Sequence, residues 1–108
     1  MKYKTIITKY PDYCIICGKP AEGHHCPYGT SNRTISDREM LVIPLCAEHH
    51  REGKLAAHKC KEIDVLLHII SQLVWEKRYI SKKRELPFEP LEEEARNEFR
   101  RLFGQSWI

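Results

Sequence analysis

Two pairs of metal ligands, each with a gap of two residues, constrain this chain more than any other feature. Cys14 and Cys17 form the first pair, and Cys46 and His49 form the second. A two-residue gap lets two side chains from one turn reach the same ion at about 2.0 to 2.3 Å, and two such turns complete a tetrahedron. The sequence therefore predicts a structural zinc site on these four residues. Two alternatives remain: Cys26 could be the third ligand, or the second pair could be an ordinary buried cysteine and a surface histidine.

The chain also carries more ligands than one zinc ion can use. The doublet His24-His25 lies between the two pairs, and His50 directly follows the second pair. Catalytic metal sites keep open positions for water or substrate, whereas structural sites are closed. The surplus histidines therefore predict a second, open site able to perform hydrolysis. The alternative is that the doublet packs against the first site as spare zinc ligands.

Size and composition indicate one small domain, in which a bound ion would stabilise a limited core. The 108 residues include five cysteines, an odd number, and residues 1–4 begin no apolar leader, so we expect a cytoplasmic protein with reduced thiols. No apolar run approaches the roughly 20 residues that cross a bilayer, so no membrane role is expected.

The net charge of +3 is too small to identify a nucleic-acid binder. The basic clusters at 77–84 and 96–101 suit either a solvated helix face or a phosphate-contacting surface.

Local patterns predict short strands in the first half of the chain and helices in the second. Turn formers mark a polar loop, and apolar residues at three- and four-residue steps mark a long amphipathic helix. A proline start, acids in the first turn and a glycine at the end mark the last helix. The predicted order is an extended arm or edge strand at 1–10, a strand at 22–26, a loop at 27–34, a strand at 40–44, a helix start at 47–52, a helix at 59–82, a break at 87–90 and a helix that ends before Gly104.

Three residues in the helical half are better explained by packing than by function. His68 falls within the apolar period of the long helix, so we expect a core or boundary histidine and not a ligand. Trp75 and Trp107 are expected to anchor the packing and not to stack on bases.

The order of the motifs resembles that of a known family. The chain carries, in sequence, Cys14-x2-Cys17, Glu22-Gly-His24-His25, a loop with Gly and Asn, and Ile43-Pro44-Leu45-Cys46-x2-His49-His50. This order resembles the HNH endonucleases in their zinc-knuckle, ββα-metal form, and most of all the small HNH-type proteins of bacteriophages and bacterial genomes, which have a loop like 28–33 and a tail like 103–108. The resemblance covers residues 14–58 well and is looser over the last two helices.

The resemblance implies the fold and the activity. The fold is α+β, with a zinc knuckle and a small ββα-metal (His-Me finger) core at 11–58 and two C-terminal helices in 59–108, all in a single domain spanning 1–108. The implied activity is metal-dependent hydrolysis of phosphodiester bonds in DNA, in a setting of phage packaging, recombination or restriction proteins. The competing interpretation is a non-catalytic zinc-binding module that docks nucleic acid or a protein, with the histidine doublet in a structural role.

The resemblance also assigns roles to individual histidines. His25 would be the general base, a role that suits an imidazole because its unperturbed pKa is about 6.5. His24 and His50 would hold the catalytic ion, which could be Mg2+, Mn2+, Ni2+ or Zn2+. The third ligand of the family falls at Lys54, which cannot bind a metal at neutral pH, so His58 is the expected replacement if Gly53 bends the chain back.

A second departure concerns the asparagine that would orient the base. Leu41 stands near the position of the asparagine that gives the family its name, and Asn32 is the nearest substitute that could orient His25. Arg33 and Arg38 flank the site in sequence and could hold the scissile phosphate, although either could equally be a plain surface arginine.

Overall fold

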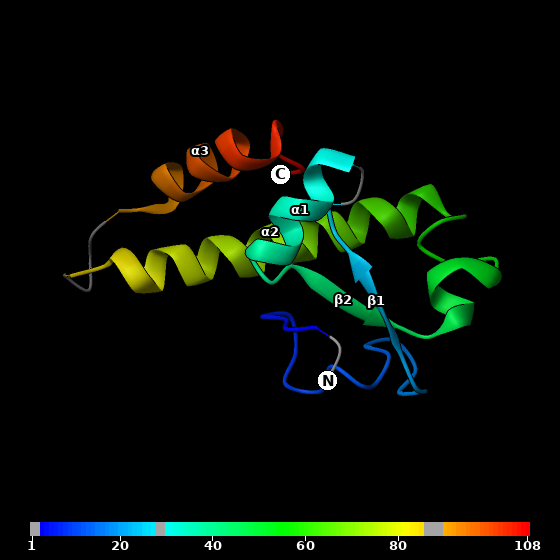
Figure 1. The fold of residues 1–108 in the computed structure, drawn as a ribbon. Coiled ribbons are helices and arrows are strands. Elements are labelled where there is room, and N and C mark those ends of the chain that lie inside the picture. The colour runs from blue at the N-terminus through cyan, green and yellow to red at the C-terminus, as the bar shows by residue number, and fades with distance from the viewer. Residues whose placement is uncertain (1–2, 28–29, 86–89) are drawn as a thin grey trace.

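A two-stranded antiparallel sheet carries the histidine doublet in the computed structural model, which describes residues 3–27, 30–85 and 90–108. Strand β1 (Glu22–His25) pairs with β2 (Val42–Leu45), so that Glu22 lies opposite Leu45 and His25 lies opposite Val42. Figure 1 shows helices packed around this small sheet. The mixed α+β class predicted from the sequence is therefore confirmed.

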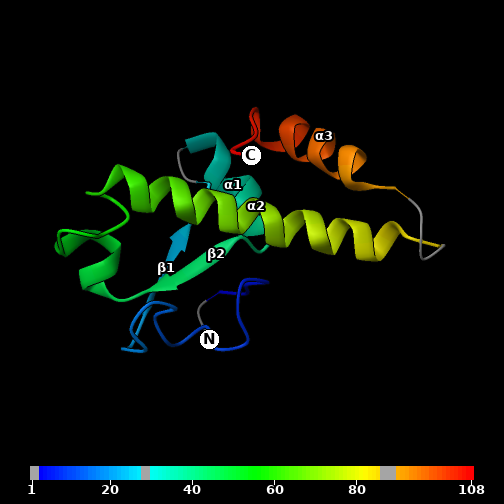
Figure 2. The same cartoon turned by 180° about the vertical axis from the view of Figure 1, so that it is seen from behind.

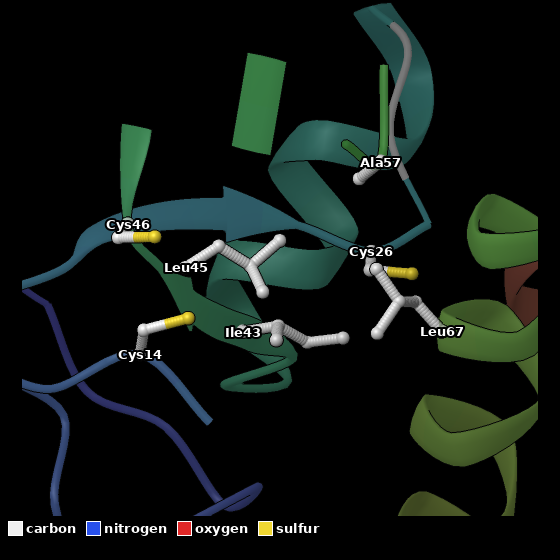
Figure 3. Packing of buried hydrophobic residues seen from close by; sticks show 7 residues of the cluster. All are labelled: Cys14, Cys26, Ile43, Leu45, Cys46, Ala57 and Leu67. Carbon is white, nitrogen blue, oxygen red and sulfur yellow. The ribbon is translucent and has the colours of Figure 1, made fainter. Parts of the chain in front are cut away.

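Strand β2 lies at the centre of the core because its apolar run leaves no polar face. All four of its residues are buried. Ile43 and Leu45 pack in one cluster with Leu67 of the long helix and with Cys14 and Cys46, two of the predicted zinc ligands (Figure 3). The sheet and the predicted zinc site thus share one core, so disrupting either destabilises the other.

The segment expected to be a polar loop at 27–34 is instead mostly a helix. Helix α1 spans Thr30–Arg38, while residues 28–29 lie outside the described part of the chain. Ile35 packs against a second core cluster, made of Leu41, Trp75, Phe99 and Phe103. The buried Ser36 hydroxyl donates a 2.5 Å hydrogen bond to the carbonyl of Pro27. The loop prediction was wrong because these tertiary contacts outweigh the weak helix propensity of a polar segment.

The N-terminal residues form an arm and not the edge strand offered as an alternative. Among the described residues of 1–10, none belongs to a strand. The Thr5 hydroxyl donates to the carbonyl of Val42 and accepts from the N–H of Ile7, and the N–H of Ile6 donates to Met40. Side-chain hydrogen bonds of this kind compete with the ladder of a sheet, which explains why no third strand forms.

Two helices complete the fold, and both were predicted. Helix α2 spans Lys61–Lys83 and α3 spans Glu92–Phe103, ending at Gly104 with φ of 81°. Most of the predicted break at 87–90 lies outside the described residues. Seen from behind, α2 runs across the whole molecule and passes in front of α1 (Figure 2). None of the helices in the described segments combines the length and apolar character that a bilayer crossing demands.

The aromatic residues of these helices and of the C-terminal segment behave as packing anchors, as expected. Trp75 is buried with Phe99 and Phe103, and Trp107 packs against the same cluster. His68 lies against the Trp107 ring at 4.3 Å between centroids and contacts the carbonyl of Asp64 through Nδ1. His68 is therefore a buried packing residue, outside the metal-ligand clusters of the described residues.

Candidate metal centres

The four ligands predicted for zinc lie together on two turns. Sγ of Cys17 is 3.5 Å from Sγ of Cys46, and Nδ1 of His49 is 3.2 Å from Sγ of Cys46 and 3.6 Å from Sγ of Cys14. Zinc bonds of 2.0 to 2.3 Å imply tetrahedron edges of about 3.3 to 3.8 Å. Cys14, Cys17, Cys46 and His49 therefore form a site that can hold a tetrahedral metal ion, and the donor set suits zinc.

The backbone of the first turn also supports thiolate ligands. Gly18 adopts φ of 78°, the left-handed conformation that only glycine takes without strain, and its N–H donates to the carbonyl of Cys14. Burial raises the pKa of Cys14, but hydrogen bonds from the backbone around Cys46 and Cys17 outweigh it and lower that pKa to about 6. Cys14 is therefore ready to bind metal as a thiolate at neutral pH.

Repulsion between the sulfurs opposes this charge when no cation is present. The backbone at Lys19 lowers the pKa of Cys17, but burial and the neighbouring sulfurs of Cys46 and Cys14 raise it more, so its pKa is above the ordinary value. A divalent cation among the sulfurs would attract each thiolate more strongly than the thiolates repel one another, and so would lower the pKa of Cys17.

Cys26, the rival third ligand, lies elsewhere. Its side chain is fully buried among apolar residues, and burial raises its pKa to about 12. A thiol that keeps its proton in an apolar core is a packing group, so the rival ligand set is not supported.

Three of the surplus histidines form a second cluster. Nε2 of His58 lies 3.0 Å from Nε2 of His50, and the His24 ring centroid is 4.9 Å from that of His50 and 5.0 Å from that of His58. One ring nitrogen from each lies within 4.8 Å of the others, which is close enough for three ligands of one ion. We call this group the histidine triad.

The turn η1 (Glu48–Glu52) allows adjacent histidines to serve two clusters. It is a π-helix, in which the N–H of Gly53 reaches the carbonyl of Glu48, five residues back. This wide turn directs His49 to the cysteines and His50 to the triad. Short π-helical turns are often found at functional sites.

Gly53 then reverses the chain, as the sequence argument required. The N–H of Ala57 donates to the carbonyl of His49 at 2.8 Å, and the N–H of His58 donates to that of His50 at 3.1 Å. A Cβ atom on Gly53 would lie 2.8 Å from the carbonyl oxygen of Glu48. Only glycine fits this approach, and the reversal brings His58 to the triad.

A carboxylate that the sequence analysis did not single out orients the triad. Oε1 of Glu22 lies 2.6 Å from Nδ1 of His50 and 3.1 Å from the guanidinium of Arg51. The hydrogen bond to His50 is the main cause that lowers the pKa of Glu22. This contact occupies Nδ1 and leaves Nε2 of His50 for a metal. The signal was present, because Glu22 precedes His24 by two residues and alternate residues of a strand share a face.

The electrostatics of the triad favour neutral, ligating imidazoles. His24 is 2% exposed, and burial followed by the charges of His50 and His58 lowers its pKa to about 3. Burial is also the main cause that lowers the pKa of His58, although its side chain reaches the surface. Neutral imidazole is the ligating form, so protons do not compete strongly with a metal here.

The remaining predicted residues lie on β1 or on α1. His25 is outside the triad, and its Nε2 lies 3.5 Å from Oδ1 of Asp37. Asn32 is half-buried on α1, and no hydrogen bond joins it to His25 among the described residues. Arg33 and Arg38 are exposed, consistent with either a phosphate contact or a plain surface position. Asp37 was missed because nothing in its local sequence marks it.

Comparisons with known proteins found no match to this chain among family models, curated proteins or solved structures.

Proposed function

We propose that this protein is a metal-dependent endonuclease of the HNH type that hydrolyses phosphodiester bonds in DNA. In this proposal β1, β2 and η1 form a ββα-metal core, and η1 replaces the usual α-helix. The observation that carries the proposal is the histidine triad, a second ligand group separate from the cluster of three cysteines and His49. A purely structural zinc module needs only the first cluster.

The triad has the character of a working site. Two of its rings are buried and ordered by packing, whereas His58 is exposed. Three neutral nitrogen ligands leave positions open for water and for a phosphate oxygen. When bound there, a divalent ion would neutralise charge on the phosphate and on the departing 3′ oxygen.

His25 is the proposed general base. Asp37 lies beside Nε2, which favours the tautomer with hydrogen on Nε2 and leaves Nδ1 to accept a proton. Water attacks phosphorus as its proton passes to Nδ1, the bond from phosphorus to the 3′ oxygen breaks, and the leaving oxygen takes a proton from solvent. Base catalysis of this kind typically contributes 10²- to 10⁴-fold.

A plasmid-nicking assay tests the proposal. Zinc-loaded protein is incubated with supercoiled DNA and Mg2+, Mn2+, Ni2+ or added Zn2+. The wild type is expected to nick with at least one ion, and His25→Ala and His50→Ala are expected to lose most of this activity. His68→Gln is the matched control, since it removes a buried imidazole outside both clusters. Nicking that is equal in wild type and His25→Ala would remove His25 from its role.

One observation favours the alternative of a non-catalytic docking module. Apolar side chains around the first cysteine pair are unusually exposed, with Tyr10 at 68%, Tyr13 at 55% and Ile16 at 49%. Exposed apolar groups that lie close together suit a protein contact. If no ion supports nicking while the triad still binds metal, this alternative is preferred.

A further inference from the structure

A hollow between the end of α1 and the second half of α2 is lined by cations and aromatic rings. Its volume is about 170 Å³, several times the roughly 30 Å³ of a water molecule. Arg38 comes from α1, and Arg78 and Lys82 come from α2, with Tyr79 between them. We call this hollow the basic groove. A hydrogen bond from Nε1 of Trp75, on α2, to Glu39, the residue after α1, joins the two segments there.

The cations from α2 in the groove differ from the other basic residues nearby. Lys83 pairs with Glu94, Arg84 with Glu92, and Arg96 with Glu76. Among the described residues, Arg78 and Lys82 have no acidic partner, and they lie four residues apart on one helix face. Like charges at this spacing repel each other. The described part of the chain therefore leaves positive charge in the groove without an acidic partner.

The acidic residue of the groove is already engaged. Glu39 accepts a 2.9 Å hydrogen bond from Nε1 of Trp75 and lies 3.3 Å from Nε of Arg38. Its carboxylate therefore offsets the charge of one cation and is fixed in place by Trp75. Two positive charges remain for a ligand.

We infer that the basic groove binds the phosphodiester backbone of DNA beside the cleavage site, an inference that rests on the proposed function. Arg38 directly follows Asp37, which contacts His25, so the groove begins one residue from the partner of the proposed base. Lysine and arginine contacts to phosphates supply affinity without reading sequence. The Tyr79 ring stacks on Trp75 with 5.3 Å between centroids and so forms part of the wall of the groove.

The groove would thus hold flanking nucleotides while the triad holds the scissile phosphate. Arg38 then contacts a neighbouring phosphate and not the one that is cut. DNA binding and cleavage become separable, because the groove and the triad share no residue.

Binding of a short fluorescein-labelled DNA duplex, measured by anisotropy without added magnesium, tests the inference. Removing two phosphate contacts is expected to weaken affinity roughly tenfold at low salt and to reduce the slope of log K against log salt by about 1.8. The test variant is Arg78→Ala/Lys82→Ala. The matched control, Lys19→Ala/Arg100→Ala, removes the same charge from residues bonded to Glu48 and Asn97 and is expected to change affinity less than about twofold. Thermal melting confirms that both variants fold.

The outcomes separate this inference from the proposed function. If the test and control variants have equal affinity and equal salt slope, the inference that the groove binds DNA is wrong. Groove-dependent binding without nicking under any ion supports the groove and refutes the endonuclease. If the wild type nicks DNA while the test and control variants bind the duplex equally well, the endonuclease is supported and the groove is refuted. His68→Gln, which lies outside the groove and both ligand clusters, is expected to bind the duplex as the wild type does.

Discussion

Oε1 of Glu22 lies 2.6 Å from Nδ1 of His50, across 28 residues of sequence. The contact joins the first residue of β1 to the turn that carries two histidines. It fixes which nitrogen of His50 faces the triad. A carboxylate that supports a metal-binding histidine in this way raises its basicity as a ligand.

Glu22→Gln is expected to weaken metal binding at the triad by about 10- to 100-fold, because the amide keeps the shape but loses the charge. Isothermal titration of zinc-loaded protein with Ni2+ or Mn2+ measures the effect. Glu48→Gln is the control, since Glu48 is exposed and makes only a 3.7 Å surface pair with Lys19. An unchanged affinity in Glu22→Gln would show that His50 needs no partner.

Removing a ligand of the cysteine cluster is expected to unfold the domain. The core around β2 includes Cys14 and Cys46, and binding of structural zinc contributes about 10 to 16 kcal/mol in small zinc domains. Cys17→Ala should therefore lose the cooperative thermal transition seen by circular dichroism. Cys60→Ala, at a half-buried cysteine outside the cluster, should keep it. A cooperative Cys17→Ala protein would mean that the fold does not depend on this site.

Gly53→Ala is expected to damage the triad while sparing the cysteine cluster. The added methyl would meet the Glu48 carbonyl at 2.8 Å, and the resulting shift costs about 1 to 3 kcal/mol. Because residues after Gly53 bring His58 back to His50, metal affinity at the triad should fall. Metal content should remain one tightly held zinc.

Gly104→Ala provides the comparison for Gly53→Ala. Its φ of 81° makes alanine unfavourable by about 1 kcal/mol, but nothing lies within 4 Å of the new methyl. Its triad affinity should equal that of the wild type. If both variants bind metal alike, the close approach at Gly53 is not what positions His58.

Acid is expected to destabilise the protein partly through His24. Its pKa is about 3 in the folded chain and about 6.5 when unfolded, so between these values the unfolded state binds one more proton. The stability from neutral His24 is therefore complete above pH 6.5 and is lost as pH falls towards 3. Urea unfolding at pH 7 and 5, before addition of a second metal, measures the loss. His24→Asn should flatten this dependence, and the difference between the two proteins cancels the acid sensitivity of the zinc thiolates.

Local spacing was enough to predict the ligand pairs and both long helices. Cys14 and Cys17 meet one ion because a tight turn allows little else, and α2 follows from a sustained apolar period. The same local reasoning failed for α1, whose polar sequence resembles a loop. Ile35 and the buried Ser36 make it helical through contacts that no local window contains.

By itself, the sequence determined which side chains could ligate metal and that Gly53 would have to turn the chain for His58 to join them. Only the tertiary structure decided that His25 lies beside Asp37, that Glu22 supports His50, and that Arg78 and Lys82 meet Arg38 in one groove. The reason is physical. Positions along one turn are fixed by backbone geometry, whereas meetings between distant segments depend on how β1, α1 and α2 pack around a shared core.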